Sequence, residues 1–229
     1  MTRLRGTIAA VAATALVVAA PAVAGSLVLH PSGFGEKSYS SWKGGEGLDD
    51  STGAKQQALY FQKNTATTTN AAGVAVFKGV EGLPTSALGD LSFYWRTDGH
   101  CGGGAPRFNL RVETAPGVRQ TFFIGCQGMV PGAEETNENG TFQERTMAGP
   151  LPPGDVVSLA LVFDEGNDVC RCNGTAGFTG GASCVYLDNI RAANHTWTSA
   201  SDNGNGEEVI QSSTPLALLL GEPIALALG

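Results

Sequence analysis

Short segments of alternating hydrophobicity, each closed by Gly, Pro, Asn or Asp, recur along this chain and limit it to a β architecture. In RFNLRVE, residues 107–113, Phe108, Leu110 and Val112 fall on one face of an extended strand, with polar residues on the other. The segments with this character are Ser26–His30, Ala58–Asn64, Gly73–Gly79, Leu91–Thr97, Arg107–Glu113, Gln120–Cys126, Val156–Phe163 and Cys184–Arg191. With 32 glycines to supply turns, the pattern predicts an all-β fold, an antiparallel two-sheet β-sandwich.

Three further segments refine this prediction. VVSLALVF, 156–163, is apolar at almost every position, which is typical of a central strand covered on both faces. GLPTSALGD, 82–90, has room for one helical turn. PGAEETNENG, 131–140, is polar throughout and predicts a mobile loop.

The two ends of the chain differ from its middle. Arg3 and Arg5 precede an apolar stretch, and Ala22-Val23-Ala24 follows Pro21, so residues 1–24 are predicted to be a secretory signal peptide cleaved after Ala24. We therefore expect a secreted, extracellular protein with one β-sandwich domain over 25–197. Residues 198–229 are predicted to be a linker and an apolar tail, TPLALLLGEPIALALG, too short and interrupted to span a membrane. The tail forms a terminal strand pair or packs on the domain, or alternatively it contacts another protein or an envelope.

Charge narrows the choice of partners. The chain has a formal net charge of -7 and a sequence pI of about 4.9, without a Lys/Arg cluster. Such a chain lacks the electrostatic surface that binds a phosphate backbone, which argues against nucleic acid as a partner.

The five cysteines predict disulfides, because exported proteins fold in oxidising compartments. Cys101 and Cys126 flank a hairpin that turns at 115–118, so its two arms bring them together as a pair. Cys184 is predicted to pair with Cys172, and Cys170–Cys184 stays open as the alternative. The remaining thiol is either free or links two chains.

The stretch RTDGHC, 96–101, suggests either a compact nucleophilic site or a disulfide-anchored loop. A paired Cys101 is no nucleophile, and triad members usually come from separate elements, so we favour the loop. A concanavalin-like hydrolase or lyase would instead need Asp98, Glu113 and Asp164 to converge from different strands. Enzymatic activity is therefore left undecided, with a non-catalytic protein favoured.

Several side chains are candidates for ligand binding. Exposed aromatic rings stack on the flat faces of sugars, and the candidate platforms are Tyr39, Trp42 and Trp197. A large aromatic side chain is more often a core residue than a binding platform, so each of these rings is alternatively part of the core. The loop residues Arg96, Asp98 and His100 are candidate polar contacts to the same ligand.

The run CVYLDNIRA, 184–192, resembles the closing strand of jelly-roll carbohydrate-binding modules. The resemblance implies a jelly-roll-like sandwich and a structural calcium on Asp188, with Glu46, Asp49 or Asp50 as partners, since calcium accepts irregular oxygen-rich coordination. The alternative is that Asp188 pairs with a backbone amide. Other stretches, among them GFGEKSYSSWKGGEGL and DGHCGGGAPRFN, are similar to uncharacterised secreted proteins of actinobacteria, a resemblance that implies export but no activity.

These observations lead to three hypotheses of function. The first is a secreted, non-catalytic β-sandwich module that binds a glycan or cell-wall polymer. The second is an envelope or spore-surface structural protein that self-associates through the spare cysteine or the tail. The third is the hydrolase or lyase described above.

Overall fold

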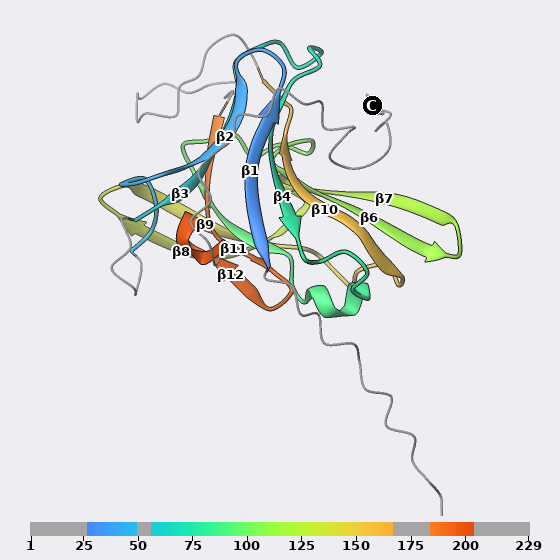
Figure 1. Ribbon diagram of the computed structural model, residues 1–229. Coiled ribbons are helices and arrows are strands. Elements are labelled where there is room, and N and C mark those ends of the chain that lie inside the picture. Colours follow the sequence, from blue (N-terminus) through green and yellow to red (C-terminus); the bar gives the residue numbers. More distant parts are fainter. Residues whose placement is uncertain (1–26, 50–55, 167–183, 204–229) are drawn as a thin grey trace, which may run out of the picture.

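The computed structural model of the protein describes residues 27–49, 56–166 and 184–203, which form two packed antiparallel sheets (Figure 1). The five-stranded sheet has the order β1 (Val28–Phe34), β4 (Ala72–Lys78), β10 (Asp155–Phe163), β6 (Arg107–Ala115) and β7 (Val118–Gly125). The seven-stranded sheet has the order β2 (Ser38–Lys43), β3 (Ala58–Lys63), β11 (Cys184–Ala192), β5 (Ser92–Arg96), β9 (Gly140–Thr146) and β8 (Val130–Asn137), and β12 (His195–Trp197) pairs with β11. Three short 3-10 turns complete these residues: η1 (Thr85–Leu88), η2 (Cys126–Gly128) and η3 (Ala200–Asn203). The predicted all-β sandwich is thereby confirmed.

The core lies between the two sheets and is built from alternate residues of each strand. Phe77 and Phe108 come from the five-stranded sheet, and Phe61 and Phe93 face them from the other, all fully buried. Trp197 of β12 packs edge-on against Phe77, with 5.2 Å between ring centroids. Large aromatic side chains from both layers therefore fill the space that the alternating pattern assigns to the core.

Much of the predicted detail is confirmed. In β6, Phe108, Leu110 and Val112 are all fully buried, as their alternation requires. The β6–β7 hairpin turns at 115–118, and η1 is the helical turn expected in 82–90. β10 is the middle strand of its sheet, and every residue from 159 to 163 is buried.

The loop predicted over 131–140 is wrong, because this segment forms β8 and the start of β9, a hairpin (Figure 1). β8 is an edge strand and nearly all its side chains are exposed. Neither face of this strand has to be apolar, so the hydrophobic alternation that marks a strand is missing. Pro131 and the consecutive residues Glu134 and Glu135 are typical of an edge strand, because proline and charged side chains prevent a further strand from pairing with it.

Cys101 and Cys126 form a disulfide with 5.3 Å between their Cα atoms, as predicted. Cys101 lies in the connection from β5 to β6, and Cys126 in the connection from β7 to β8. Each connection passes from one sheet to the other. The bond therefore joins two crossings between the layers. Cys184 is also disulfide-bonded, and the choice between Cys170 and Cys172 lies outside the described residues.

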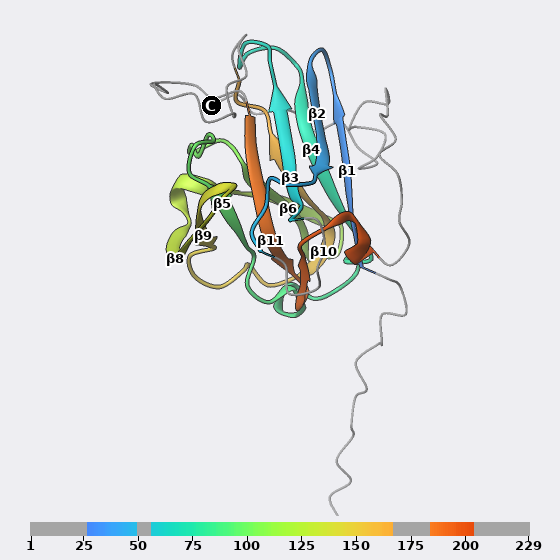
Figure 2. The ribbon, with the colours of Figure 1, turned by 90° about the vertical axis from the view of Figure 1, so that its left-hand side faces the viewer.

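On the opposite margin, β1 and β2 carry the chain between the two sheets through a short turn (Figure 2). The hydroxyl of Ser40 donates to the carbonyl of Ser32 and accepts from its N–H, each at 3.0 Å. A side chain at Gly33 would lie 2.6 Å from the Cα of Tyr39, so only glycine allows this approach. No helix of the described ranges is long and apolar enough to cross a membrane.

Candidate functional site

The outer face of the seven-stranded sheet carries a row of tyrosine rings that ends on an arginine. Tyr60 of β3 is paired in register with Tyr186 of β11, and their ring centroids lie 4.9 Å apart. Tyr39 of β2 packs on Tyr60 at 5.8 Å. The guanidinium carbon of Arg96, at the end of β5, lies 3.8 Å from the centroid of Tyr186. Tyr60 and Tyr186 are buried, whereas Tyr39 is half-buried and forms the accessible end of the row.

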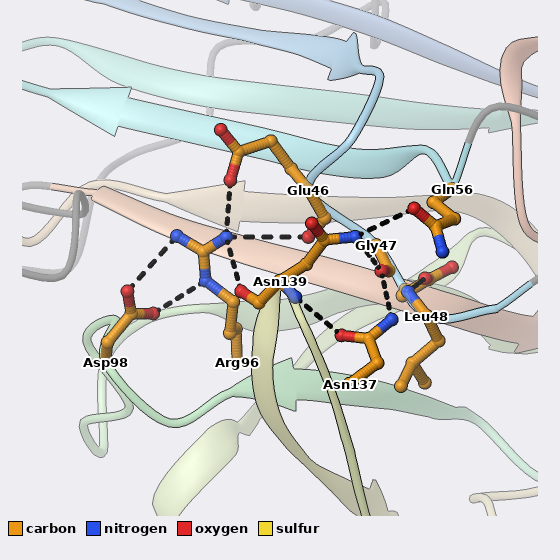
Figure 3. A network of polar contacts seen from close by, with 9 residues as sticks. Glu46, Gly47, Leu48, Gln56, Arg96, Asp98, Asn137 and Asn139 are labelled. Atoms are coloured by element: carbon orange, nitrogen blue, oxygen red, sulfur yellow. Dashed lines mark hydrogen bonds and ion pairs between the residues drawn. The ribbon is translucent and has the colours of Figure 1, made fainter.

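Arg96 is only 3% exposed and binds two carboxylates (Figure 3). Its Nε and Nη2 donate to both oxygens of Asp98, at 2.8 and 3.1 Å, and Nη1 donates to Oε2 of Glu46 at 2.6 Å. Burial by itself lowers the pKa of Arg96, but the hydrogen bonds and charges of Asp98 and Glu46 outweigh it, so the pKa lies above its ordinary value. The guanidinium stays charged, and both carboxylate side chains keep about a third of their surface in solvent (34% and 35%).

The connection between β2 and β3 is held over this face by amide groups (Figure 3). The carbonyl of Gly47 accepts from Nδ2 of Asn137 and Nδ2 of Asn139, each at 2.9 Å, and the N–H of Gly47 donates to the carbonyl of Gln56 at 2.8 Å. A Cβ at Gly47 would lie 2.3 Å from a backbone oxygen. Asn137 and Asn139 belong to the β8–β9 hairpin, so this hairpin positions the segment that carries Glu46.

Asp188 lies fully buried in β11 and accepts backbone hydrogen bonds. Its Oδ2 accepts from the N–H of Leu48 at 2.7 Å, and its Oδ1 from the N–H of Asn189 at 2.6 Å. Of the proposed calcium partners, Glu46 binds Arg96, and Asp49 accepts from Nε2 of Gln56 at 2.6 Å.

These residues do not fit a calcium ion, because both oxygens of Asp188 accept backbone N–H groups, Glu46 is bound to Arg96, and Oδ1 of Asp49 accepts from the amides of Gln56 and Asn137. In the part of the chain that the structure describes, no three His, Cys, Asp or Glu side chains gather as a metal-binding group. Asp50 lies outside that part. The alternative, that Asp188 pairs with backbone amides, is the arrangement found.

A second polar cluster lies where β10 ends. His100 contacts Glu165 through Nε2, and Arg107 forms a two-bonded ion pair with Asp164 at 2.5 and 2.6 Å. His100 therefore turns to Glu165, whereas Asp98 turns to Arg96. Sequence proximity in RTDGHC produces no triad.

The three carboxylates of the hydrolase hypothesis do not converge. Glu113 pairs with Arg119 near the tip of the β6–β7 hairpin, and Asp164 pairs with Arg107 at the other end of β6. Arg107 and Glu113 are separated by roughly 20 Å at the rise of an extended strand. The predicted convergence of Asp98, Glu113 and Asp164 is therefore wrong.

The tryptophan candidates belong to the core. Trp197 is 0% exposed, so it is wrong as a platform on the surface. Trp42 is half-buried and packs against the main core, on the opposite face of β2 from Tyr39.

Sequence reasoning found Tyr39, Arg96 and Asp98 but missed Tyr60 and Tyr186, although both alternate with core residues in their strands. That alternation is the signal that could have found them. The amides at 56, 137 and 139 carried no such signal, because their roles depend on loops from distant parts of the chain.

Comparison with family models, with curated proteins and with solved structures finds no match to this chain. The fold and the site by themselves define an antiparallel β-sandwich with an aromatic and charged outer sheet face. The resemblance to secreted actinobacterial proteins stays a prediction.

Proposed function

We propose that the protein is a secreted, non-catalytic module that binds a glycan on the outer face of its seven-stranded sheet. The observation that carries this proposal is the half-buried ring of Tyr39, the accessible end of a row that continues through the buried rings of Tyr60 and Tyr186 to Arg96. Aromatic rings offer flat apolar faces to sugar C–H groups, while carboxylates and guanidinium groups satisfy sugar hydroxyls.

The polar part of the site is preorganised. Arg96 holds the carboxylates of Glu46 and Asp98 in fixed positions while each remains partly open to solvent. A rigid set of acceptors beside a ring loses little conformational entropy when it binds a ligand. This geometry suits recognition of a polyhydroxylated ligand better than acid–base chemistry, because both carboxylates are bound to the same cation.

Secretion is supported by the signal-like N-terminus and by the disulfide, since such bonds persist mainly outside the reducing cytosol. Fractionation of the producing cells, with mass determination of the exported form, tests this part. Cleavage after residue 24 is expected, and retention of the whole chain in the cytosol would overturn it.

Binding is tested by co-sedimentation with cellulose, chitin, xylan and purified peptidoglycan. Retention on at least one polymer is expected, and Tyr39→Ala should weaken it roughly tenfold, the loss of one stacked ring. Phe123→Ala removes a 53% exposed ring on the other sheet and is the matched control. The proposal fails if no polymer retains the protein, or if the two variants lose binding equally. Release of reducing sugar from a bound polymer would overturn the non-catalytic part.

A further inference from the structure

The five-stranded sheet carries a buried apolar strip on the face that points away from the core. In β4 and β10, Phe77 and Leu161 face the core, and their neighbours along the strands face outward. The outward residues pair across the two strands, Val74 with Val162 and Val76 with Ala160. The strip consists of Ala72, Val74, Val76, Ala160 and Val162.

These five side chains are at most 3% exposed, although they lie on the outside of the sheet. The same face is more open elsewhere, because Phe123 of β7 is 53% exposed and Ser158 of β10 is only partly buried. Among the described residues, Phe34 is the one partly buried hydrophobic side chain packed on the strip. One phenylalanine ring is too small to cover five side chains on two strands, so the strip needs a further apolar partner.

The width and borders of the strip limit what covers it. The apolar residues lie on two neighbouring strands and make the strip roughly 10 Å wide. His30 and Ser32 of β1 lie on one side and Arg107 and Asn109 of β6 on the other, and all but His30 are at most 9% exposed, so the cover reaches both borders. A narrow apolar strip between polar borders fits a single chain segment better than a second domain, which needs a broader interface.

We propose that the apolar tail, residues 214–229, docks on this strip. The tail carries ten Leu, Ile and Ala side chains and a single charge, Glu222. The described chain ends at Asn203 in η3, which packs beside β1, the neighbour of β4 (Figure 2). Residues 204–213 reach roughly 30 Å when extended, enough to bring the tail across β1 to the strip. The tail is then an intramolecular cover for the second face of β10, which the apolar run 156–163 requires.

The test compares the intact chain with a chain that ends at Ser213, both with the same N-terminus. On truncation, the methyl resonances of Val74, Val76 and Val162 should shift while that of Val112, in the core, stays unchanged. The fluorescence of an anilinonaphthalene dye should rise several-fold, and the synthetic peptide 214–229 should reverse both effects. Unchanged methyl resonances would overturn the proposal, because the strip would then be covered without the tail.

Point variants in the intact chain keep the proposal testable if truncation harms folding. Leu219→Asp in the tail and Val162→Lys in the strip should each reproduce the dye signal. Ser158→Lys, on the same strand and face but outside the strip, is the matched control and should not. Analytical ultracentrifugation of the intact chain gives its oligomeric state and so shows whether the segment that covers the strip belongs to the same molecule. A dimer of the intact chain that dissociates together with the methyl shifts would assign the strip to a second copy and overturn the intramolecular form.

Discussion

The carboxylate of Asp188 accepts the backbone N–H of Leu48 at 2.7 Å, and this bond fastens the connection between β2 and β3 to the centre of the seven-stranded sheet. The two residues are 140 positions apart in sequence. The segment that carries Glu46 thus depends on a residue of β11, which explains why a buried acid stands in this central strand.

Replacing Asp188 should destabilise the fold without a change of volume. In Asp188→Asn one acceptor oxygen becomes an NH₂ group that faces an N–H, so a buried donor loses its partner. We expect a loss of about 2 to 3 kcal/mol in the free energy of unfolding, measured by urea titration. Asp90→Asn, at an exposed position, should change it by less than about 0.5 kcal/mol. Equal effects would contradict the role assigned to Asp188.

Removing divalent cations tests whether Asp188 binds backbone N–H groups, as in the structure, or a calcium ion. Backbone N–H groups bind both oxygens of Asp188, and side-chain amides bind Oδ1 of Asp49. EDTA should therefore leave the thermal midpoint of the purified protein unchanged, and added Ca²⁺ should not raise it. Calorimetry in both conditions provides the measurement. A midpoint that falls in EDTA and recovers with Ca²⁺ would restore the calcium hypothesis.

Removing Arg96 should be costly, because two carboxylates converge on this buried cation. Arg96→Met keeps much of the packing on Tyr186 but leaves Glu46 and Asp98 to repel each other. Since the carboxylates are partly exposed, we expect a loss of about 2 to 3 kcal/mol in the free energy of unfolding, below the value for a fully buried pair. Arg119→Met breaks the exposed pair with Glu113 and should have little effect, and a comparable loss there would argue against a special role for Arg96.

The Cys101–Cys126 bond should stabilise the domain through the loop it closes. The sequence separation is 25 residues, for which the chain-entropy model gives about 3 kcal/mol. The double variant Cys101→Ala/Cys126→Ala should lose that amount in chemical denaturation, and peptide mapping of the parent should recover the pair intact. Mapping that finds either cysteine joined elsewhere would refute the assigned pairing.

Tyr94 should make the fold sensitive to alkali. Burial, a hydrogen bond with Glu135 and the charge of Glu144 raise the pKa of Tyr94 to about 12, from an ordinary value of 10.0. The unfolded chain therefore loses this proton first as the pH rises, so the stabilisation is intact below about pH 10 and falls toward pH 12. Between pH 10 and 11.5 the free energy of unfolding of the parent should fall more steeply than that of Tyr94→Phe in urea titrations. Parallel curves for the two proteins would contradict the raised pKa.

Hydrophobic alternation predicts the strands that have one apolar face. It does not predict strands whose side chains form hydrogen bonds or face solvent. β2, SYSSWK, was missed because Ser40 points inward and binds backbone atoms of β1 and β4 instead of packing as an apolar residue. β8 was missed because an edge strand exposed on both faces needs no alternation. Within the site, Arg96 and Asp98 were found from their spacing, whereas the contact of Arg96 with Glu46 depends on a loop folding back over the sheet and has no local signature.

The two margins of the sandwich have a mechanical consequence. Along one margin, hydrogen bonds between Ser32 and Ser40 join β1 to β2. Along the other, the Cys101–Cys126 disulfide joins the two connections that pass between the sheets. The two sheets cannot separate along either margin while these hydrogen bonds and this disulfide are intact. Water and proteases should therefore reach the core first at the ends of the sandwich, where the strands begin and end, and last along its two margins.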